Sequence, residues 1–263
     1  MPDAYQQLLD DLVAEQQYLD GQLADVPDGD WQSDTPCRGW MVRDVIAHLA
    51  EVDDNAAAVA SGTTTQMEGG VRSADGTRSA LQDSSRHMTR LQLVDWWRAA
   101  RQRLQDALRP LDARTRLPWA GPPMSARSFA TARLMECWSH GLDALDGAGV
   151  ELIHSDRLQH IAHLGYITRS FAYQTRGLEP NDEPLRVELT LPSGAAWSRG
   201  DEDSTNVIRG SAPDFCRVVT QRIHYRDTEL SYTPGAAEEF LQVAQAFAGP
   251  PGEGRPPQGL LSR

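Results

Sequence analysis

The sequence predicts a mainly α protein in which a helical bundle precedes a small α+β domain. Apolar residues recur at helical spacing through most of residues 1–180. After "GLEPNDEP" the pattern changes, and "LRVELTLP" alternates apolar and polar residues, as a half-buried strand does. We therefore expect a bundle over residues 1–180, a small α+β domain over residues 181–250 and a flexible tail over residues 251–263.

Five helices are expected in the first part of the chain, over residues 5–23, 41–60, 89–111, 126–147 and 156–176. Pro27 and Gly29 break the pattern after the first helix, and Ser125 precedes the fourth as a hydrogen-bonding N-cap. Residues 61–86 are rich in Gly, Ser and Thr. We expect a long loop there, which could cover a site.

The second domain is expected to combine short strands with two helices. After the strand in "LRVELTLP", the stretches "AAWSRG" and "TNVIRG" are further strand candidates separated by turn residues. Ser211 begins "SAPDFCRVVTQRI" and can cap a helix, and "GAAEEFLQVAQAFAG" is one more helix. The sequence shows no internal repeat.

Composition and charge narrow the class of function. The chain has 263 residues, 40% hydrophobic and 24% charged, as soluble globular proteins do. A formal net charge of -12 argues against nucleic acid as a partner, and no apolar run reaches the ~20 residues of a membrane span. The three scattered cysteines and the absence of a signal-peptide pattern predict a cytoplasmic protein. We expect a small-molecule substrate and a monomer or homodimer.

The stretch "MECWSHGLD" raises the possibility of a metal site. Glu136 and His140 lie four positions apart, so a helix places them one turn apart on one face. His48, at the edge of the apolar face of the helix over residues 41–60, could supply a third ligand, because helix bundles build metal sites from facing helices.

An alternative reading of the same helix puts this pair in water. The large apolar side chains gather on one side of the helical wheel, and Glu136 and His140 fall almost opposite them. A metal site therefore requires that the helix be covered on both sides. From spacing alone, both readings stay open.

Three longer stretches resemble a known family. "TPCRGWMVRDVIAHLAEVD" and "PPMSARSFATARLMECWSHGLDAL" are similar to two motifs of the mycothiol-dependent maleylpyruvate isomerase family, within the DinB-like metal-binding superfamily. "VIRGSAPDFCRVVTQRIHYRDTEL" resembles an actinobacterial branch of it. The resemblance implies a DinB-like four-helix bundle followed by a small sterol-carrier-like domain. It also implies a divalent metal, zinc first and nickel or another metal next, held by His48, Glu136 and His140.

Two further residues are candidate catalytic groups. Asp143, one turn beyond His140, could orient that imidazole or merely lie on the surface. Arg222 falls where the family has a polar patch, and family members use arginines to hold substrate carboxylates; solvation at the surface is the alternative. Arg133 is a further anion-binding candidate by its position alone.

Other polar residues have weaker claims. Asp44, one turn before His48, could act as Asp143 does, whereas His160 and His163 are more simply core histidines. Cys37 is best interpreted as a small buried hydrophobe. Relatives usually have Thr where this chain has Met41, so the helix beginning there should lose an N-cap worth about 1 kcal/mol.

The resemblance and the ligand set together predict a metal-dependent enzyme. A site of two histidines and one glutamate leaves a coordination position open, at which a metal can lower the pKa of a thiol. In relatives that thiol is mycothiol, which adds to a small electrophilic substrate before isomerisation or transfer. A thiol-independent Lewis-acid isomerase, cyclase or hydrolase is one alternative, and a non-catalytic small-molecule binding protein is another.

Overall fold

The computed structural model describes residues 3–65, 79–119, 123–252 and 254–258, and they form two compact units. The first unit spans residues 1–152 and the second residues 153–263. The division comes before the boundary expected near residue 180, because the helix after it packs within the second unit. The mainly helical fold with a small sheet confirms the predicted fold class.

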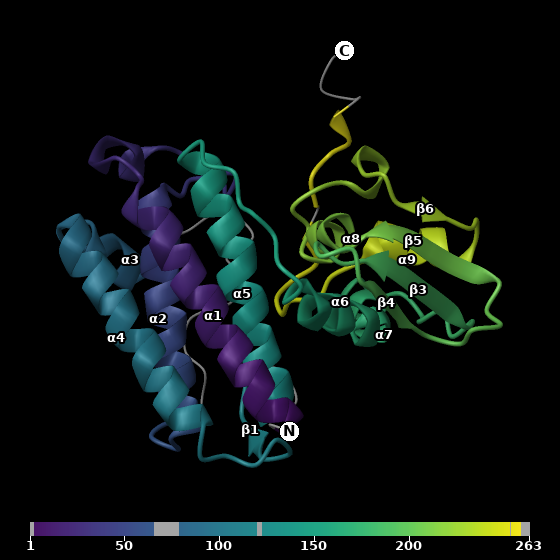
Figure 1. Ribbon diagram of the computed structural model, residues 1–263, viewed down its shortest axis with the longest axis horizontal. Helices are drawn as coiled ribbons and strands as arrows, with labels where there is room; N and C mark the ends of the chain where they lie inside the picture. Colours follow the sequence, from purple (N-terminus) through teal and green to yellow (C-terminus); the bar gives the residue numbers. More distant parts are fainter. Residues whose placement is uncertain (1–2, 66–78, 120–122, 253, 259–263) are drawn as a thin grey trace. The chain divides into compact units, whose positions relative to one another are not determined.

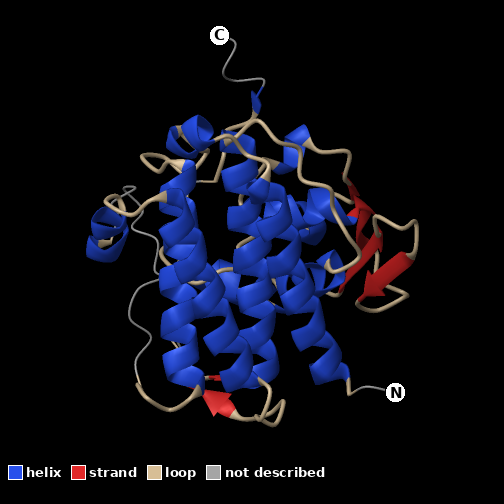
Figure 2. Ribbon diagram, turned by 60° about the vertical axis from the view of Figure 1, so that its left-hand side comes forward, coloured by secondary structure: helices blue, strands red, loops and turns tan. Residues whose placement is uncertain are grey.

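Four long helices run side by side in the first unit (Figures 1 and 2). They are α1 (Ala4–Ala24), α2 (Val42–Ala60), α4 (Arg90–Leu108) and α5 (Ala126–Gly147). Their bounds agree closely with the first four predicted helices, because each carries a long apolar stripe. Helix α5 packs against α1 and α2, and α4 packs mainly against α2.

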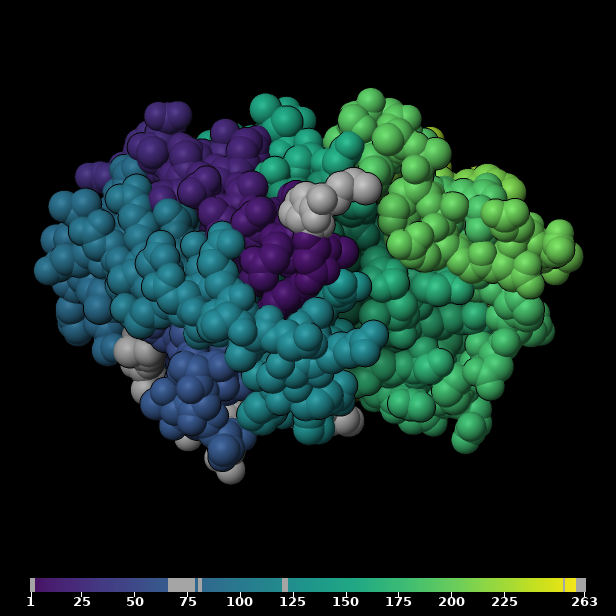
Figure 3. Space-filling view, turned by 60° about the horizontal axis from the view of Figure 1, so that its bottom comes forward, coloured from purple at the N-terminus to yellow at the C-terminus, as the bar shows by residue number. Residues whose placement is uncertain are grey.

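Ion pairs tie the outer faces of these helices together. Asp20 of α1 pairs with Arg98 and Arg101 of α4, and Arg103 of α4 pairs with Asp54 of α2. Figure 3 shows the purple surface of α1 beside the blue-green surface of α4. Such partly exposed pairs contribute little stability singly, about 0–1 kcal/mol each.

The predicted loop over residues 61–86 is only partly described, because residues 66–78 lie outside the described residues. Its last part is not loop: it forms α3 (Ala80–Ser85), which begins at a capping serine, Ser79, and packs on α2. The Gln82 amide donates to the backbone oxygen of Asp44 at 3.1 Å. Gln82 and Asp44 are 38 positions apart, and the loop-like composition of residues 61–86 does not predict their contact.

Short elements join the long ones: a 3-10 helix (Asp28–Gln32) follows α1, and β1 (Arg116–Leu117) pairs with β2 (Met124–Ser125) just before α5. Ser125 caps α5 as predicted, accepting from the Ser128 amide. No helix within the described part of the chain combines the length and apolar composition that a membrane span needs.

The second unit packs helices on a four-stranded sheet. The sheet consists of β3 (Leu185–Thr190), β4 (Ala196–Arg199), β5 (Asn206–Ser211) and β6 (Ser231–Tyr232), in the order β4-β3-β5-β6. Strands β3 and β5 are parallel, and the other pairs are antiparallel. Helices α8 (Ala212–Val219) and α9 (Ala236–Val243) pack on β5. A 3-10 helix (Tyr225–Asp227) lies between them in the chain.

The fifth predicted helix, over residues 156–176, is two helices, α6 (Leu158–Ile167) and α7 (Arg169–Thr175). The break falls at Thr168, whose hydroxyl donates to the Leu164 carbonyl at 2.8 Å. The Thr168 backbone, with a φ of -88° and a ψ of 9°, departs there from helical geometry. The predicted tail over residues 251–263 is partly outside the described residues, at 253 and 259–263.

Candidate metal centre

Helices α2 and α5 bring the three predicted ligands together. His48 comes from α2, whereas Glu136 and His140 come from α5. Glu136 Oε2 lies 3.6 Å from His48 Nε2 and 3.4 Å from His140 Nε2. The two imidazole centroids are 4.7 Å apart. The ligand atoms of all three residues lie within 4.8 Å of one another, and we call this set the His–Glu cluster.

Both histidines are buried and the Glu136 side chain is only 20% exposed, so the reading that put Glu136 and His140 in water is wrong. His140 is 2% exposed and His48 4% exposed. The helical wheel was misleading because α5 is covered on more than one side. Helix α2, which carries His48, packs against α5, and α1 packs against it as well. Gly141 permits this approach, since a Cβ there would lie 3.0 Å from the Leu19 side chain.

The start of α2 is held by Asp44 rather than by a capping side chain at Met41. Asp44 Oδ2 accepts the Met41 amide at 3.0 Å, and the Arg86 guanidinium pairs with both oxygens of the same carboxylate. Asp44 is fully buried in this arrangement. It therefore stabilises the beginning of α2 and is not the orienting partner of His48.

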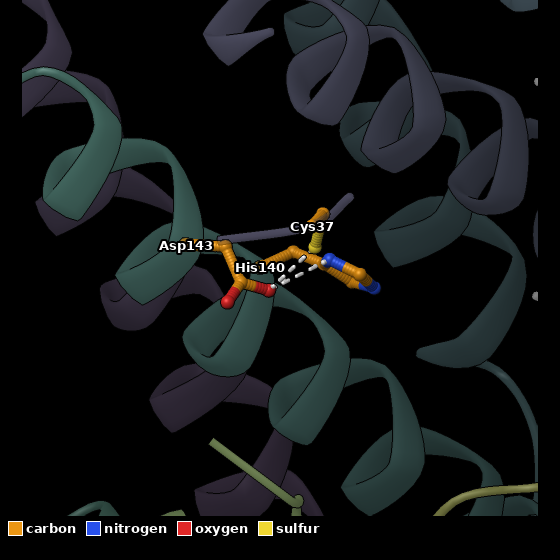
Figure 4. Close-up of side chains that lie close together, drawn as sticks. All are labelled: Cys37, His140 and Asp143. Atoms are coloured by element: carbon orange, nitrogen blue, oxygen red, sulfur yellow. Dashed lines mark hydrogen bonds and ion pairs between the residues drawn. The ribbon is translucent and has the colours of Figure 1, made fainter. Parts of the chain in front are cut away.

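Asp143 lies beside His140, on the side away from Glu136. Asp143 Oδ2 is 3.4 Å from His140 Nδ1, and the same oxygen accepts a hydrogen bond from the Cys37 thiol at 3.1 Å (Figure 4). Asp143 is 1% exposed. The two nitrogens of His140 thus face different carboxylates, Nε2 toward Glu136 and Nδ1 toward Asp143. Cys37, His140 and Asp143 also form a second set of side chains that could hold a metal.

A turn before α2 supplies two residues whose place at the site was not predicted. The Trp40 ring lies 5.0 Å from the His48 ring and 6.1 Å from the His140 ring, nearly parallel to the latter at 20°. Cys37 is the other residue. The available signal was their position in "TPCRGW", directly before the helix that carries His48.

Burial and charge set the protonation of the cluster. Burial lowers the pKa of His48 to about 4, although the Glu136 carboxylate opposes the shift. Burial alone would lower the pKa of His140, but Asp143, Cys37 and Glu136 together raise it to about 10. Burial would raise the pKa of Glu136, but His140 and His48 hold it well below its usual range. Without a metal, the cluster at neutral pH therefore combines a neutral His48, an ionised Glu136 and a protonated His140.

A second buried polar network lies close by on the same helices. Asp53 Oδ1 accepts from Arg133 Nε at 3.1 Å, and Asp53 Oδ2 accepts from the Gln16 amide at 3.2 Å. Gln16 in turn accepts from the Gln105 amide at 2.9 Å. These four residues come from α4, α1, α2 and α5, and we call them the four-helix tie. Arg133, a candidate anion binder by position, is thus held by a buried carboxylate.

The remaining candidates belong to the second unit. Arg222 follows α8, is 6% exposed and donates from Nη1 to the Thr220 carbonyl at 2.7 Å, so it is not a solvated surface arginine. Gln221, just before it, has a left-handed φ of 59°. His160 and His163 lie on α6, and among the described residues neither belongs to a group of side chains suited to a metal.

Comparison with known proteins places the chain in a family. A sequence model described as the mycothiol maleylpyruvate isomerase N-terminal domain matches residues 12–145, which include the whole His–Glu cluster. Two curated relatives from strains of Mycobacterium tuberculosis, "Uncharacterized protein Rv0036c" and "Uncharacterized protein MT0041", are each 40% identical over 248 residues. The alignment covers 93% of this chain and 96% of each relative.

Solved structures share the fold at much lower identity. A crystal structure of mycothiol-dependent maleylpyruvate isomerase aligns with a TM-score of 0.59 at 16% identity, covering 89% of this chain and 94% of that one. A point mutant of such an isomerase aligns with a TM-score of 0.58 at 18% identity, covering 84% and 90%. The sequence matches confirm the resemblance seen in the motifs, and the chain belongs to the mycothiol-dependent maleylpyruvate isomerase family.

Proposed function

We propose that the chain is a metal-dependent enzyme in which His48, Glu136 and His140 hold one divalent ion. The ion would activate a thiol, mycothiol in the first instance, for transfer to or isomerisation of a small electrophilic substrate. The observation that carries the proposal is the convergence of three ligand atoms, one of which is a buried nitrogen without a hydrogen bond among the described residues. His48 Nε2 is buried and has no hydrogen-bond partner among the described residues.

The spacing of the ligand atoms suits a tetrahedral ion. Bonds of about 2.0–2.1 Å to zinc place neighbouring tetrahedral ligands roughly 3.3 Å apart. The distances from Glu136 Oε2 to the two histidine nitrogens are 3.4 and 3.6 Å. The contact to His48 is too long for a good hydrogen bond, yet the pair is close enough to share an ion. We propose zinc first and nickel next, because imidazole ligands suit both ions.

Charge also favours a cation at this place. In the metal-free cluster, two carboxylates, Glu136 and Asp143, flank one imidazolium, His140. A buried excess of negative charge is costly. Exchange of the His140 proton for a divalent ion would change the net charge of these groups from minus one to zero.

Each residue has a definite part in this scheme. His48 and His140 would bind the ion through Nε2 and Glu136 through a carboxylate oxygen, leaving a fourth position for an external thiol. A bound divalent ion lowers the pKa of such a thiol, so that the thiolate forms near neutral pH. Asp143 would orient His140 through Nδ1. The Glu136 side chain remains 20% exposed, so the cluster can be approached from its side.

The substrate would be held by charge outside the cluster. We propose Arg222 for this role, because this residue is 6% exposed rather than solvated, and the planar fork of an arginine suits a carboxylate. Arg222→Lys keeps the charge but loses the planar fork. It should raise KM for an anionic substrate while leaving metal content unchanged.

Elemental analysis of tag-free protein tests the proposal first. We expect about one divalent ion per chain in the wild type and almost none in a His48→Ala, His140→Ala double variant. His160→Ala is the matched control, because it removes a histidine from α6 outside the cluster. A wild type that is metal-free and takes up neither zinc nor nickel would contradict the ligand assignment.

Activity assays on the loaded protein then separate the possible reactions. Turnover of maleylpyruvate or a related electrophilic acid that requires mycothiol supports the thiol mechanism. Turnover without any thiol would favour Lewis-acid or hydrolytic chemistry. A bound ion with no turnover in either assay, together with tight binding of a small ligand, would favour a binding protein.

A further inference from the structure

The turn that carries Cys37 is rigidly built. The Trp40 amide donates to the Cys37 carbonyl at 2.9 Å, and the Cys37 amide donates to Thr35 Oγ1 at 3.1 Å. The Thr35 hydroxyl donates to the Trp40 carbonyl at 2.9 Å. Gly39 has a φ of 79°, which the third position of a type II turn requires and which L residues rarely adopt. The backbone of Cys37 is thus held on both sides before its side chain makes any contact.

From this turn the thiol reaches α5. Cys37 Sγ donates to Asp143 Oδ2 at 3.1 Å, and Figure 4 shows that this oxygen points toward both the sulfur and the His140 ring. The distance from the same oxygen to His140 Nδ1 is 3.4 Å. All three residues are at most 4% exposed. Water is therefore a poor substitute for either contact.

Besides its own place beside the His140 ring, the thiol influences this metal ligand through Asp143. A carboxylate beside Nδ1 keeps the proton on that nitrogen and leaves the Nε2 lone pair for an ion. A carboxylate can do so only while its own orientation is fixed, and a buried carboxylate that loses a donor rotates to find another. The Cys37 thiol is such a donor, on the same oxygen that faces His140.

We propose that Cys37 is a positioning residue, which holds Asp143 so that Asp143 holds His140 with Nε2 toward His48 and Glu136. This inference rests on the proposed metal site. It assigns to the "TPCRGW" turn a part in metal binding in addition to its part in folding. Cys37 itself would not touch the ion.

The test compares Co²⁺ and Zn²⁺ affinity in Cys37→Ala, Cys37→Ser and Cys137→Ala. Loss of a direct outer partner of a metal ligand typically weakens binding about 10–100-fold, and because Cys37 acts through Asp143, we expect a loss at the lower end, about 10-fold, in Cys37→Ala. Cys37→Ser should recover most of it, because a hydroxyl can donate to Asp143. Cys137 is also a buried thiol of the helical unit, and its replacement by alanine should leave affinity within about twofold.

Two spectroscopic readouts separate positioning from other roles. In ring-nitrogen NMR of the metal-free protein, the His140 Nδ1–H signal should be sharp in the wild type and in Cys37→Ser but broadened in Cys37→Ala. Equal affinities and equal His140 spectra in wild type and Cys37→Ala would overturn the proposal. A sulfur-to-Co²⁺ charge-transfer band that disappears in Cys37→Ala would also overturn it, because Cys37 would then be a ligand.

The same experiment distinguishes failure of the inference from failure of the proposed function. If the wild type binds neither ion, the metal site is wrong, and the NMR comparison on metal-free protein still decides whether Cys37 positions His140. If the wild type binds metal and Cys37→Ala binds it equally well with an unchanged His140 spectrum, only the positioning role is wrong.

Discussion

The His–Glu cluster and the four-helix tie are two polar networks that share helices α2 and α5, and they are built differently. In the tie, Asp53 receives hydrogen bonds on both oxygens, and Arg133 Nη2, which makes no hydrogen bond among the described residues, is still ion-paired with Asp53 Oδ1 at 3.0 Å. In the cluster, His48 Nε2 has no hydrogen-bond partner among the described residues. Arg133 and Glu136 are only three positions apart on α5. Neighbouring positions of one helix thus serve a network in which a carboxylate is ion-paired with an arginine and one in which two histidines meet a carboxylate.

The difference indicates what each network is for. A buried network whose members match one another joins helices and specifies how they pack. A buried network with an orphaned nitrogen and an excess of carboxylates is incomplete by itself, and a ligand can complete it. Burial alone does not distinguish the two cases, since Arg133 and His48 are both 4% exposed.

The largest effect on stability is expected from breaking the tie. Asp53→Ala leaves the Arg133 charge buried without its partner, which should lower the free energy of unfolding by about 3–5 kcal/mol. Asp54→Ala, the next position on α2, removes only partly exposed contacts and should cost about 1 kcal/mol or less. Urea unfolding of both variants measures the difference. Equal costs would mean that the tie is not structural.

The next largest effect is the stabilisation of the folded protein by zinc, which should depend on the cluster and not on the tie. An ion that binds the folded protein at 100 times its Kd adds about 2.7 kcal/mol to the free energy of unfolding. We expect this gain in the wild type and its loss in His48→Ala. Asp53→Asn should begin from a lower stability but keep the gain. If Asp53→Asn also loses it, the two networks act as one site. Unfolding with zinc or with a chelator gives the answer.

The smallest effect is the pH dependence of the metal-free protein. The pKa of His140 is raised to about 10, so its stabilising contribution is complete below pH 6.5 and is lost as pH rises toward 10. The pKa of His48 is lowered to about 4, so the unfolded chain takes up a proton below pH 6.5 that the folded one refuses. These two groups favour a stability maximum near pH 6.5, measurable by urea unfolding with a chelator.

With zinc bound, the stability of the protein should no longer fall as pH rises above 6.5. Metal binding requires a neutral His140, so uptake at pH 7 should release about one proton per ion and strengthen as pH rises. Calorimetry in buffers of different ionisation enthalpy counts the protons released. Release of none would mean that His140 is already neutral in the metal-free protein.

Local patterns in the sequence account for most of the helical unit. Apolar periodicity and the Ser125 cap place α5 at Ala126–Gly147, the range that was predicted. The same patterns failed at Thr168, where one predicted helix is divided into two, and at α3, where a loop-like composition hides a capped helix. At α3 the determining contact is the side chain of Ser79, which accepts from the Gln82 backbone amide, and hydrophobic periodicity does not detect such a cap.

For the site, the sequence by itself determined the spacing of Glu136 and His140 and, through its motifs, the family. Only the tertiary structure decided that α5 is covered on more than one side, that Asp44 belongs to the start of α2, and that Arg133 is held by Asp53. The thiol of Cys37 and the carboxylate of Asp143 are 106 positions apart in the chain. Contacts of this range depend on how whole helices pack, and no local pattern of residues encodes them.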